Sequence, residues 1–458
     1  MNKKCRIRIA HDHFKILHAH LFPGDNDEHG AVLLAGMSHV NGQLTLLVRE
    51  VHLAVDGLDY VEGKVGYRAL QPSFIHRLIT KARDEKLAYL AVHNHFSDRQ
   101  VGFSQIDLDS HDLGYPALLQ ISRGMPVGAL VFGHRSVAAD IWISKTVRMG
   151  ISEAVIVGRT IQRLTSSPKS SPTSTTLAHD RQVRMFGKAG QAELTECRVA
   201  VIGLGGIGSL VAEYLARLGI GHFTLVDGDI VEETNLSRVV GASAADVRKK
   251  LAKVKIAKRV ILGANKRAKV KLIVDDVAKA SIASELTDCD YIFLAADSMR
   301  ARLVFNAIVH QYLIPGVQLG SKVRSDIDGS LADVMSASRP VRPNHGCLWC
   351  NQLIDTTLLA KEAKSDEERR AQEYGVEEPN PSVISLNAVS AAHAVNDFLL
   401  DYLGLRSDTA LICYEHFHFL SQKRDLVQPR RDQDCSECSY QGLRYARGNS
   451  VELPCIEG

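Results

Sequence analysis

Apolar residues along this chain recur in two different periods, and their alternation predicts an α/β protein. In the first third of the chain, short apolar runs typical of buried strands are separated by helix-like stretches such as 74–83. The expected strands are 31–35, 44–48, 87–92 and 127–132. Strands and helices mixed in this way are typical of an α/β domain.

The pattern beyond residue 197 predicts a doubly wound parallel sheet. Residues 198–202 form a short apolar strand that ends in glycines, and residues 209–218 place their apolar side chains on one helical face. Gly219 then provides a natural end to that helix. Further strands are expected at 223–226, 270–274 and 291–295. Alternating strands and helices of this kind build a Rossmann-like sheet.

The clearest break in composition is TSSPKSSPTSTT at 165–176, which is rich in Ser, Thr and Pro and has the character of an exposed linker. We therefore expect an N-terminal domain over 1–160, a linker over 161–178 and a C-terminal domain over 179–458. A length of 458 residues is consistent with more than one domain.

Composition excludes several classes of protein. The net charge of +3 is too small to indicate a nucleic-acid or membrane partner, and no apolar run is long enough to span a bilayer. The basic N-terminus lacks the apolar core of a secretory signal. Four of the nine cysteines form two C-x-x-C pairs, which favours a reducing compartment and a metal site over disulfides. We expect a cytoplasmic protein.

The segment HNHFSDRQVGFSQID contains the ligands of a candidate metal site. His93 and His95 flank one residue at the end of a strand, so their side chains share a face. Asp107 follows His95 by twelve residues, with Ser104 three positions before it. A His-x-His pair alone is common on protein surfaces, but the added Ser-x-x-Asp favours a metal site. Two imidazoles and one carboxylate leave a zinc (Zn2+) position open, as in catalytic sites.

This segment resembles the JAMM (JAB or MPN) metalloprotease family, whose signature is His-x-His-Pro, seven residues, Ser, two residues and Asp. Every spacing matches, but Phe96 replaces the usual Pro and Asn94 the usual Ser or Thr, which leaves activity open. The resemblance implies zinc-dependent hydrolysis of peptide or isopeptide bonds, with a glutamate as the base and Ser104 helping to hold the oxyanion.

Two glutamates are candidates for that base. Glu28 precedes a glycine-bounded apolar strand, much as the catalytic glutamate of the family does, and we favour it over Glu50 at the end of the next strand. A second histidine cluster has no carboxylate at a matching spacing, so we expect its members on a helix face: His11, His13, His18 and His20.

A glycine-rich turn marks a nucleotide site in the C-terminal domain. Gly203, Gly205, Gly206 and Gly208 follow a strand and open a helix, where backbone and helix N-terminus favour phosphate. Asp227, nineteen residues beyond Gly208, ends the next strand, where a carboxylate can hold ribose hydroxyls. A dinucleotide-dependent dehydrogenase shares these features.

The residues that follow favour a polyphosphate over a dinucleotide. A hydrogen-bond donor and two cations follow: Asn235, Arg238 and Lys253. A polyphosphate that is attacked at its α-phosphate needs such groups, whereas a nicotinamide cofactor does not. The sequence contains no G-x-x-x-x-G-K-[ST], which excludes a P-loop as the ATP site.

Residues 180–403 resemble ubiquitin-activating enzymes and their bacterial thiamine and molybdopterin counterparts (ThiF/MoeB type). DRQVRMFG, from Asp180, resembles the N-terminal Asp-Arg-Gln helix of that family, and 381–399 its later core helix. The resemblance implies that Arg181 reaches the ATP site of a partner subunit, so a homodimer is expected. It also implies the nucleotide contacts, with Asp227 at the ribose, Asn235, Arg238 and Lys253 at the triphosphate, and Asp297 at magnesium (Mg2+).

The reaction implied by the resemblance is attack of a C-terminal glycine carboxylate on ATP, which yields an acyl-adenylate and pyrophosphate. The acceptor would be a small ubiquitin-like or sulfur-carrier β-grasp protein. We interpret the chain as a bifunctional enzyme of a prokaryotic ubiquitin-like system, with sulfur-carrier activation in cofactor or amino-acid biosynthesis as the alternative. A non-enzymatic nucleotide-sensing scaffold is a third hypothesis.

Four cysteines in two C-x-x-C pairs predict a closed, structural zinc site: Cys347, Cys350, Cys435 and Cys438. Residues 351–381, where a transfer cysteine is expected, contain none, and Cys455 is a weak candidate. The adenylate would therefore pass to a partner, such as a conjugating enzyme, or end in sulfur transfer. Both outcomes stay open.

Overall fold

The structure, a computed structural model, describes residues 4–61, 68–168, 176–326, 328, 330–363, 381–407 and 409–456. The chain divides into two compact units. The first comprises Met1–Ser170, Gln311–Leu313 and Tyr440–Glu452, and the second comprises Ser171–His310, Ile314–Ser439 and Leu453–Gly458. Two short segments of the predicted C-terminal domain thus belong to the first unit. Part of the predicted linker, 169–175, lies outside the described residues.

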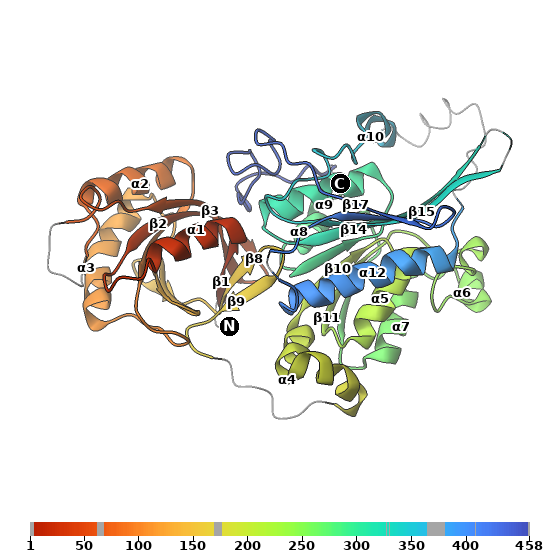
Figure 1. Cartoon of the computed structure of the whole chain (residues 1–458), viewed down its shortest axis with the longest axis horizontal. Helices are drawn as coiled ribbons and strands as arrows, with labels where there is room; N and C mark the ends of the chain where they lie inside the picture. The colour runs from red at the N-terminus through yellow and green to blue at the C-terminus, as the bar shows by residue number, and fades with distance from the viewer. Residues whose placement is uncertain are drawn as a thin grey trace. The chain divides into compact units, whose positions relative to one another are not determined.

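A nine-stranded mixed sheet forms the centre of the first unit, in the order β7-β6-β5-β4-β2-β3-β1-β8-β9 (Figure 1). Its strands are β1 (Lys4–Ala10), β2 (Gly30–Val40), β3 (Gln43–Leu53), β4 (Ala88–Asn94), β5 (Val127–Gly133), β6 (Ser136–Ser144), β7 (Val147–Met149), β8 (Ala154–Val157) and β9 (Ile161–Leu164). The four strands expected in this region are confirmed within β2, β3, β4 and β5.

Helices cover both faces of this sheet, which explains why β2 is apolar at consecutive positions. On one face, Leu33 packs in a core with Leu17 and Leu21 of α1 (His11–Leu21). On the other face, Leu34 packs in a core with side chains of α2 (Pro72–Asp84) and α3 (Gln105–Ile121). Successive strand residues point to opposite faces, so a strand buried on both sides is apolar throughout.

The second unit contains an eight-stranded sheet in the order β12-β11-β10-β13-β14-β15-β16-β17. Its parallel part consists of β10 (Arg198–Ile202), β11 (His222–Val226), β12 (Lys269–Ile273), β13 (Tyr291–Leu294) and β14 (Gly316–Ser325). The expected parallel sheet is confirmed for these strands. It is wrong for the antiparallel extension formed by β15 (Leu331–Val341), β16 (Tyr414–His418) and β17 (Lys423–Val427).

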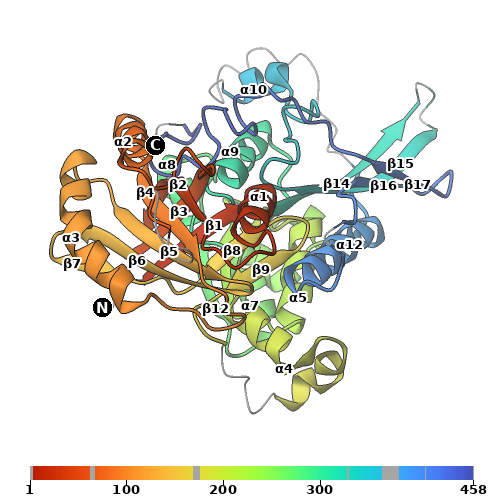
Figure 2. The same ribbon diagram turned by 60° about the vertical axis from the view of Figure 1, so that its left-hand side comes forward.

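Helices again cover both faces of this sheet. Figures 1 and 2 show α5 beside α12 on one face, whereas α8 and α9 lie on the other. The helices of the second unit within the described residues are α4 (Asp180–Glu196), α5 (Gly206–Arg217), α6 (Ala244–Arg248), α7 (Lys253–Ala264), α8 (Ala280–Glu285), α9 (Met299–Gln311, ending in the first unit), α10 (Thr356–Glu362) and α12 (Ile384–Tyr402), with the short turns η1 (Leu177–His179) and η2 (Glu233–Asn235). Among the described residues, no helix combines the length and apolarity needed to cross a bilayer.

Candidate functional site

The glycine-rich turn is tightly packed on its inner side and open on its outer side. Gly203 follows β10 with a φ of +85°, and a Cβ there would lie 2.7 Å from the backbone nitrogen of Ala296. A Cβ at Gly208 would lie 1.8 Å from the carbonyl oxygen of Gly203, whereas one at Gly205 would meet nothing within 4 Å. The turn therefore leaves space beside Gly205 at the N-terminus of α5, where a phosphate is favoured.

Asp227 links the end of β11 to this turn. One carboxylate oxygen accepts a hydrogen bond from the backbone nitrogen of Leu204 at 2.5 Å, and the other accepts one from that of Asp229 at 2.8 Å. Burial raises the pKa of Asp227, and the two backbone hydrogen bonds oppose that shift. A carboxylate has about four lone-pair positions, so capacity remains for ribose hydroxyls.

Two predicted triphosphate ligands, Arg238 and Lys253, lie near the glycine turn and the residues after β11. Lys253 begins α7, and its Nζ lies 2.7 Å from Asp229 Oδ2, while the Lys253 side chain is 12% exposed. Arg238 donates to the carbonyl oxygen of Thr234 at 2.8 Å, and its Cδ lies 3.3 Å from where a Cβ at Gly206 would stand. Both cations thus lie near the carboxyl ends of the central strands, where nucleotides bind in such sheets.

Asn235 has a structural task that the sequence did not reveal. Its side-chain oxygen accepts a hydrogen bond from the backbone nitrogen of Glu232 at 3.2 Å, which caps η2, and the residue is 7% exposed. The predicted triphosphate contact therefore stays a prediction. Arg181, which the resemblance assigns to the ATP site of a partner subunit, lies exposed on α4.

Asp297 is exposed between β13 and α9, close to a carboxylate that sequence reasoning missed. Glu362 accepts hydrogen bonds from the backbone nitrogens of Met299 and Arg300, at 2.8 and 2.9 Å, and so caps α9. Burial lowers the pKa of Arg302, while the charges of Asp297 and Glu362 oppose that shift. The predicted magnesium ligand therefore has a second carboxylate, Glu362, and a guanidinium, Arg302, in its neighbourhood.

A second residue missed by sequence reasoning, Asn387, packs against the glycine turn from α12. Its amide nitrogen lies 2.3 Å from where a Cβ at Gly206 would stand, and the residue is 1% exposed. Its side chain donates to Ser382 Oγ at 3.0 Å and accepts from Ser321 Oγ at 2.9 Å. The helix also carries Ser390, His393 and Asp397, so nothing in the sequence singles out Asn387.

In the first unit, the predicted metal ligands come together at the end of β4 and the start of α3. One ligand atom from each of His93, His95 and Asp107 lies within 4.8 Å of the others. The Nε2 atoms of the two histidines are each 3.7 Å from an Asp107 oxygen, and His93 Nε2 is buried with no hydrogen-bond partner in the described part of the chain. Two imidazoles and a carboxylate at this spacing are a donor set that fits zinc.

The structure distinguishes between the two candidate glutamates. Glu28 Oε1 lies 3.7 Å from His95 Nε2, and burial raises the pKa of Glu28. Glu50 instead binds Lys81 Nζ at 2.7 Å and His52 Nε2 at 2.8 Å. Only Glu28, of these two, is positioned beside the histidines.

Ser104 is the N-cap residue of α3 and holds Asp107 in place. Its hydroxyl donates to Asp107 Oδ2 at 2.7 Å, and the Asp107 backbone nitrogen donates back to that hydroxyl at 3.2 Å. Such contacts orient a ligating carboxylate. They give Ser104 a second task besides the predicted oxyanion contact.

The four cysteines of the two C-x-x-C pairs also form a cluster. Their sulfur atoms lie 3.5 Å apart for Cys347 and Cys350, 3.8 Å for Cys347 and Cys435, and 3.7 Å for Cys350 and Cys438. Asn306 of α9 accepts a hydrogen bond from the Leu348 backbone nitrogen at 2.8 Å and so holds the first pair. Four thiols in a closed cluster fit a tetrahedral structural zinc.

Comparison with known proteins decides the family. The model of the ThiF family matches residues 179–437, more than half of the chain. This chain belongs to the ThiF family. The matched residues include the parallel strands, the glycine turn and Asp227.

The ThiF-family chain resembles several curated relatives. It is 36% identical over 121 residues to the sulfur carrier protein ThiS adenylyltransferase of Bacillus subtilis (26% of this chain, 36% of the relative). It is 33% identical over 138 residues to the tRNA threonylcarbamoyladenosine dehydratase of Escherichia coli (30% and 51%). It is 32% identical over 129 residues to the SAMP-activating enzyme E1 of Haloferax volcanii (28% and 47%). The matches thus span about a third to a half of each relative.

Proposed function

We propose that this ThiF-family chain adenylates the C-terminal carboxylate of a small ubiquitin-like or sulfur-carrier β-grasp protein with ATP. The observation that carries the proposal is the convergence of an open glycine turn, Asp227 and Lys253 at the carboxyl ends of β10 and β11. Asp227 would hold the ribose, and the helix N-terminus would hold phosphate. Asp297 would hold magnesium, which neutralises phosphate charge when bound.

In the proposed reaction, a carboxylate oxygen of the carrier bonds to the α-phosphorus and the bond to pyrophosphate breaks. Negative charge grows on the phosphate oxygens in the transition state, so fixed cations near them lower the barrier. Lys253 and Arg238 supply that charge, and Asn235 would add a donor. Arg181, exposed on α4, would serve the site of the partner in a homodimer.

The carrier class is supported by two relatives, named for a sulfur carrier and for activation of SAMP. A third relative is named for dehydration of a modified tRNA, so the acceptor needs a direct test. The adenylate would then react with the thiol of a conjugating enzyme or with a sulfur donor. Residues 364–380, in the segment where a transfer cysteine was sought, lie outside the described residues.

The test is to incubate the chain with MgATP and purified β-grasp proteins that end in glycine, and to measure pyrophosphate release and intact carrier mass. We expect an AMP adduct on the carrier terminus, lost in Asp297→Ala. Absence of both pyrophosphate and adduct with every carrier would favour a nucleotide-sensing scaffold.

A second activity is proposed for the first unit, on the observation that His93, His95 and Asp107 converge beside Glu28. We propose a zinc peptidase that trims a carrier precursor or removes the carrier from a target. Zinc held by these three residues would lower the pKa of a bound water toward neutrality. Glu28, 3.7 Å from His95 Nε2, would take a proton from the nucleophile and return it to the leaving amine.

This second activity is tested with a carrier extended by a short C-terminal peptide. Asp107→Ala should abolish cleavage and lower the zinc content while adenylation persists. The control is Asp109→Ala on the same helix, whose side chain binds only Gln105 at 2.8 Å among the described residues. Equal cleavage by both variants would refute the assignment.

A further inference from the structure

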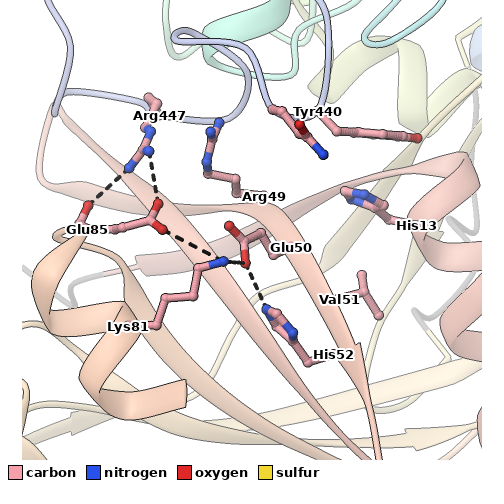
Figure 3. Close-up of a pocket in the computed structure, with 10 residues that line it drawn as sticks. His13, Arg49, Glu50, Val51, His52, Lys81, Glu85, Tyr440 and Arg447 are labelled. Carbon is pink, nitrogen blue, oxygen red and sulfur yellow. Dashed lines mark hydrogen bonds and ion pairs between the residues drawn. The ribbon is translucent and has the colours of Figure 1, made fainter. Parts of the chain in front are cut away.

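A polar pocket in the first unit has no part in either proposed reaction. Its volume is about 620 Å³, and it is lined by His13, Arg49, Glu50, Val51, His52, Lys81, Glu85, Tyr440, Gln441 and Arg447 (Figure 3). All ten residues belong to the first unit, from α1, β3, α2 with the residue after it, and the segment 440–452. The volume is in the range of small-molecule sites.

The walls of this pocket are fixed by contacts between distant parts of the sequence. Arg49 donates to the carbonyl oxygens of Tyr445 and, at 3.2 Å, of Gly442. Arg447 donates to the carbonyl and carboxylate oxygens of Glu85 at 3.1 and 3.0 Å. The ring of Tyr440 stacks on that of His13 with centroids 4.2 Å apart. The pocket is therefore organised before any ligand binds.

Several hydrogen-bonding groups around the pocket are uncommitted. Each guanidinium carries five N–H donors, and the bonds above use only the terminal nitrogens of Arg49 and Arg447. Arg49 Nε and His13 Nδ1 are buried and have no hydrogen-bond partner among the residues that the structure describes; the two residues are 6% and 8% exposed. Buried polar atoms without partners cost free energy, and the terminal guanidinium donors are the groups that a ligand can reach.

The charge of the lining favours an anion. Arg49, Lys81 and Arg447 outnumber Glu50 and Glu85, which leaves one net positive charge with neutral imidazoles. Burial and the charge of Arg447 both lower the pKa of Arg49, so the two guanidiniums repel each other. An oxyanion between them would relieve that repulsion and accept paired hydrogen bonds.

We propose that this pocket binds a small ligand with a phosphate or carboxylate group, held by Arg49, Arg447 and Lys81. The stacked rings of His13 and Tyr440 offer a flat wall for the rest of the ligand. One wall comes from the segment 440–447, so binding also fastens that segment to α2 and β3.

The test is isothermal titration of the full chain with inorganic phosphate and, separately, with citrate. We expect one saturable site per chain for at least one anion, bound at least tenfold more weakly by Arg447→Gln. Arg83→Gln, an equal charge loss on α2 outside the lining, should bind within twofold of wild type. Lys253→Ala should do the same, which separates this pocket from the glycine turn. No saturable binding, or unchanged affinity in Arg447→Gln, overturns the proposal.

A second measurement on the wild-type chain covers the case in which Arg447→Gln does not fold. Phenylglyoxal modifies accessible arginines, and peptide mass spectrometry locates the modified sites. The bound anion should slow modification of Arg447 but not of Arg83. Equal protection of both, or of neither, contradicts the proposal.

Discussion

Lys253→Ala removes the cation that the account places beside the reacting phosphate. Lys253 is 12% exposed, whereas its partner Asp229 is 71% exposed. Unit charges about 4 Å apart attract by about 4 kcal/mol at an effective dielectric constant of 20. Because Asp229 is so exposed, its ion pair with Lys253 contributes at most about 1 kcal/mol, and binding of Lys253 to the phosphate must first offset the loss of that pair. The net loss is about 3 kcal/mol, or roughly 10²-fold in rate.

The assay is carrier-dependent ATP–pyrophosphate exchange, measured as kcat/KM for ATP. Lys255→Ala is the matched control, because Lys255 is exposed on the same helix and its loss changes the net charge equally. We expect the control to retain wild-type exchange and both variants to cleave a carrier fusion normally. A loss below threefold in Lys253→Ala, or an equal loss in the control, would refute the electrostatic reasoning.

Three further predictions concern other parts of the second unit. Burial lowers the pKa of His393, but Asp397 and Glu415 outweigh burial and raise it to about 9. The pKa of His393 in the folded state lies above its unfolded value of about 6.5. Protonated His393 therefore stabilises the fold fully below about pH 6.5, and this stabilisation is lost as the pH rises through about 9. Denaturant titration should therefore show wild type losing up to about 3 kcal/mol more than His393→Gln between pH 6 and 10, and parallel pH profiles would contradict this. Metal analysis should find two zinc ions per wild-type chain and one in Cys435→Ser. An unchanged zinc content in the variant would exclude the cysteine cluster as a zinc site. Asn387→Ala should raise KM for ATP roughly tenfold with little change in kcat, because it loosens the glycine turn; a fall in kcat alone would argue against that positioning role.

The elements predicted correctly from sequence are those whose signal is local. The glycine turn, α5 and Asp227 lie within one strand–helix–strand unit, so spacing alone places them together. The same holds for His95 and Asp107, separated by one loop and the first turn of α3.

The features that were missed depend on contacts between distant segments. The antiparallel pairing of β15 with β16 joins residues nearly eighty positions apart, and no periodicity in either strand reveals the partner. Glu362 and Asn387 act on α9 and on the glycine turn from elements far along the chain. Segment 440–452 packs within the first unit through its backbone carbonyls, which accept from Arg49, and through Arg447, which binds Glu85 more than 350 positions earlier.

The central claim is that a polyphosphate nucleotide, and not a redox dinucleotide, binds across the glycine turn. Calorimetric titration of the chain with a non-hydrolysable ATP analogue plus magnesium, and separately with NAD+, tests it most directly. We predict saturable binding of the ATP analogue, weaker binding in Asp227→Ala, and no binding of NAD+. Tight NAD+ binding without binding of the analogue would contradict it.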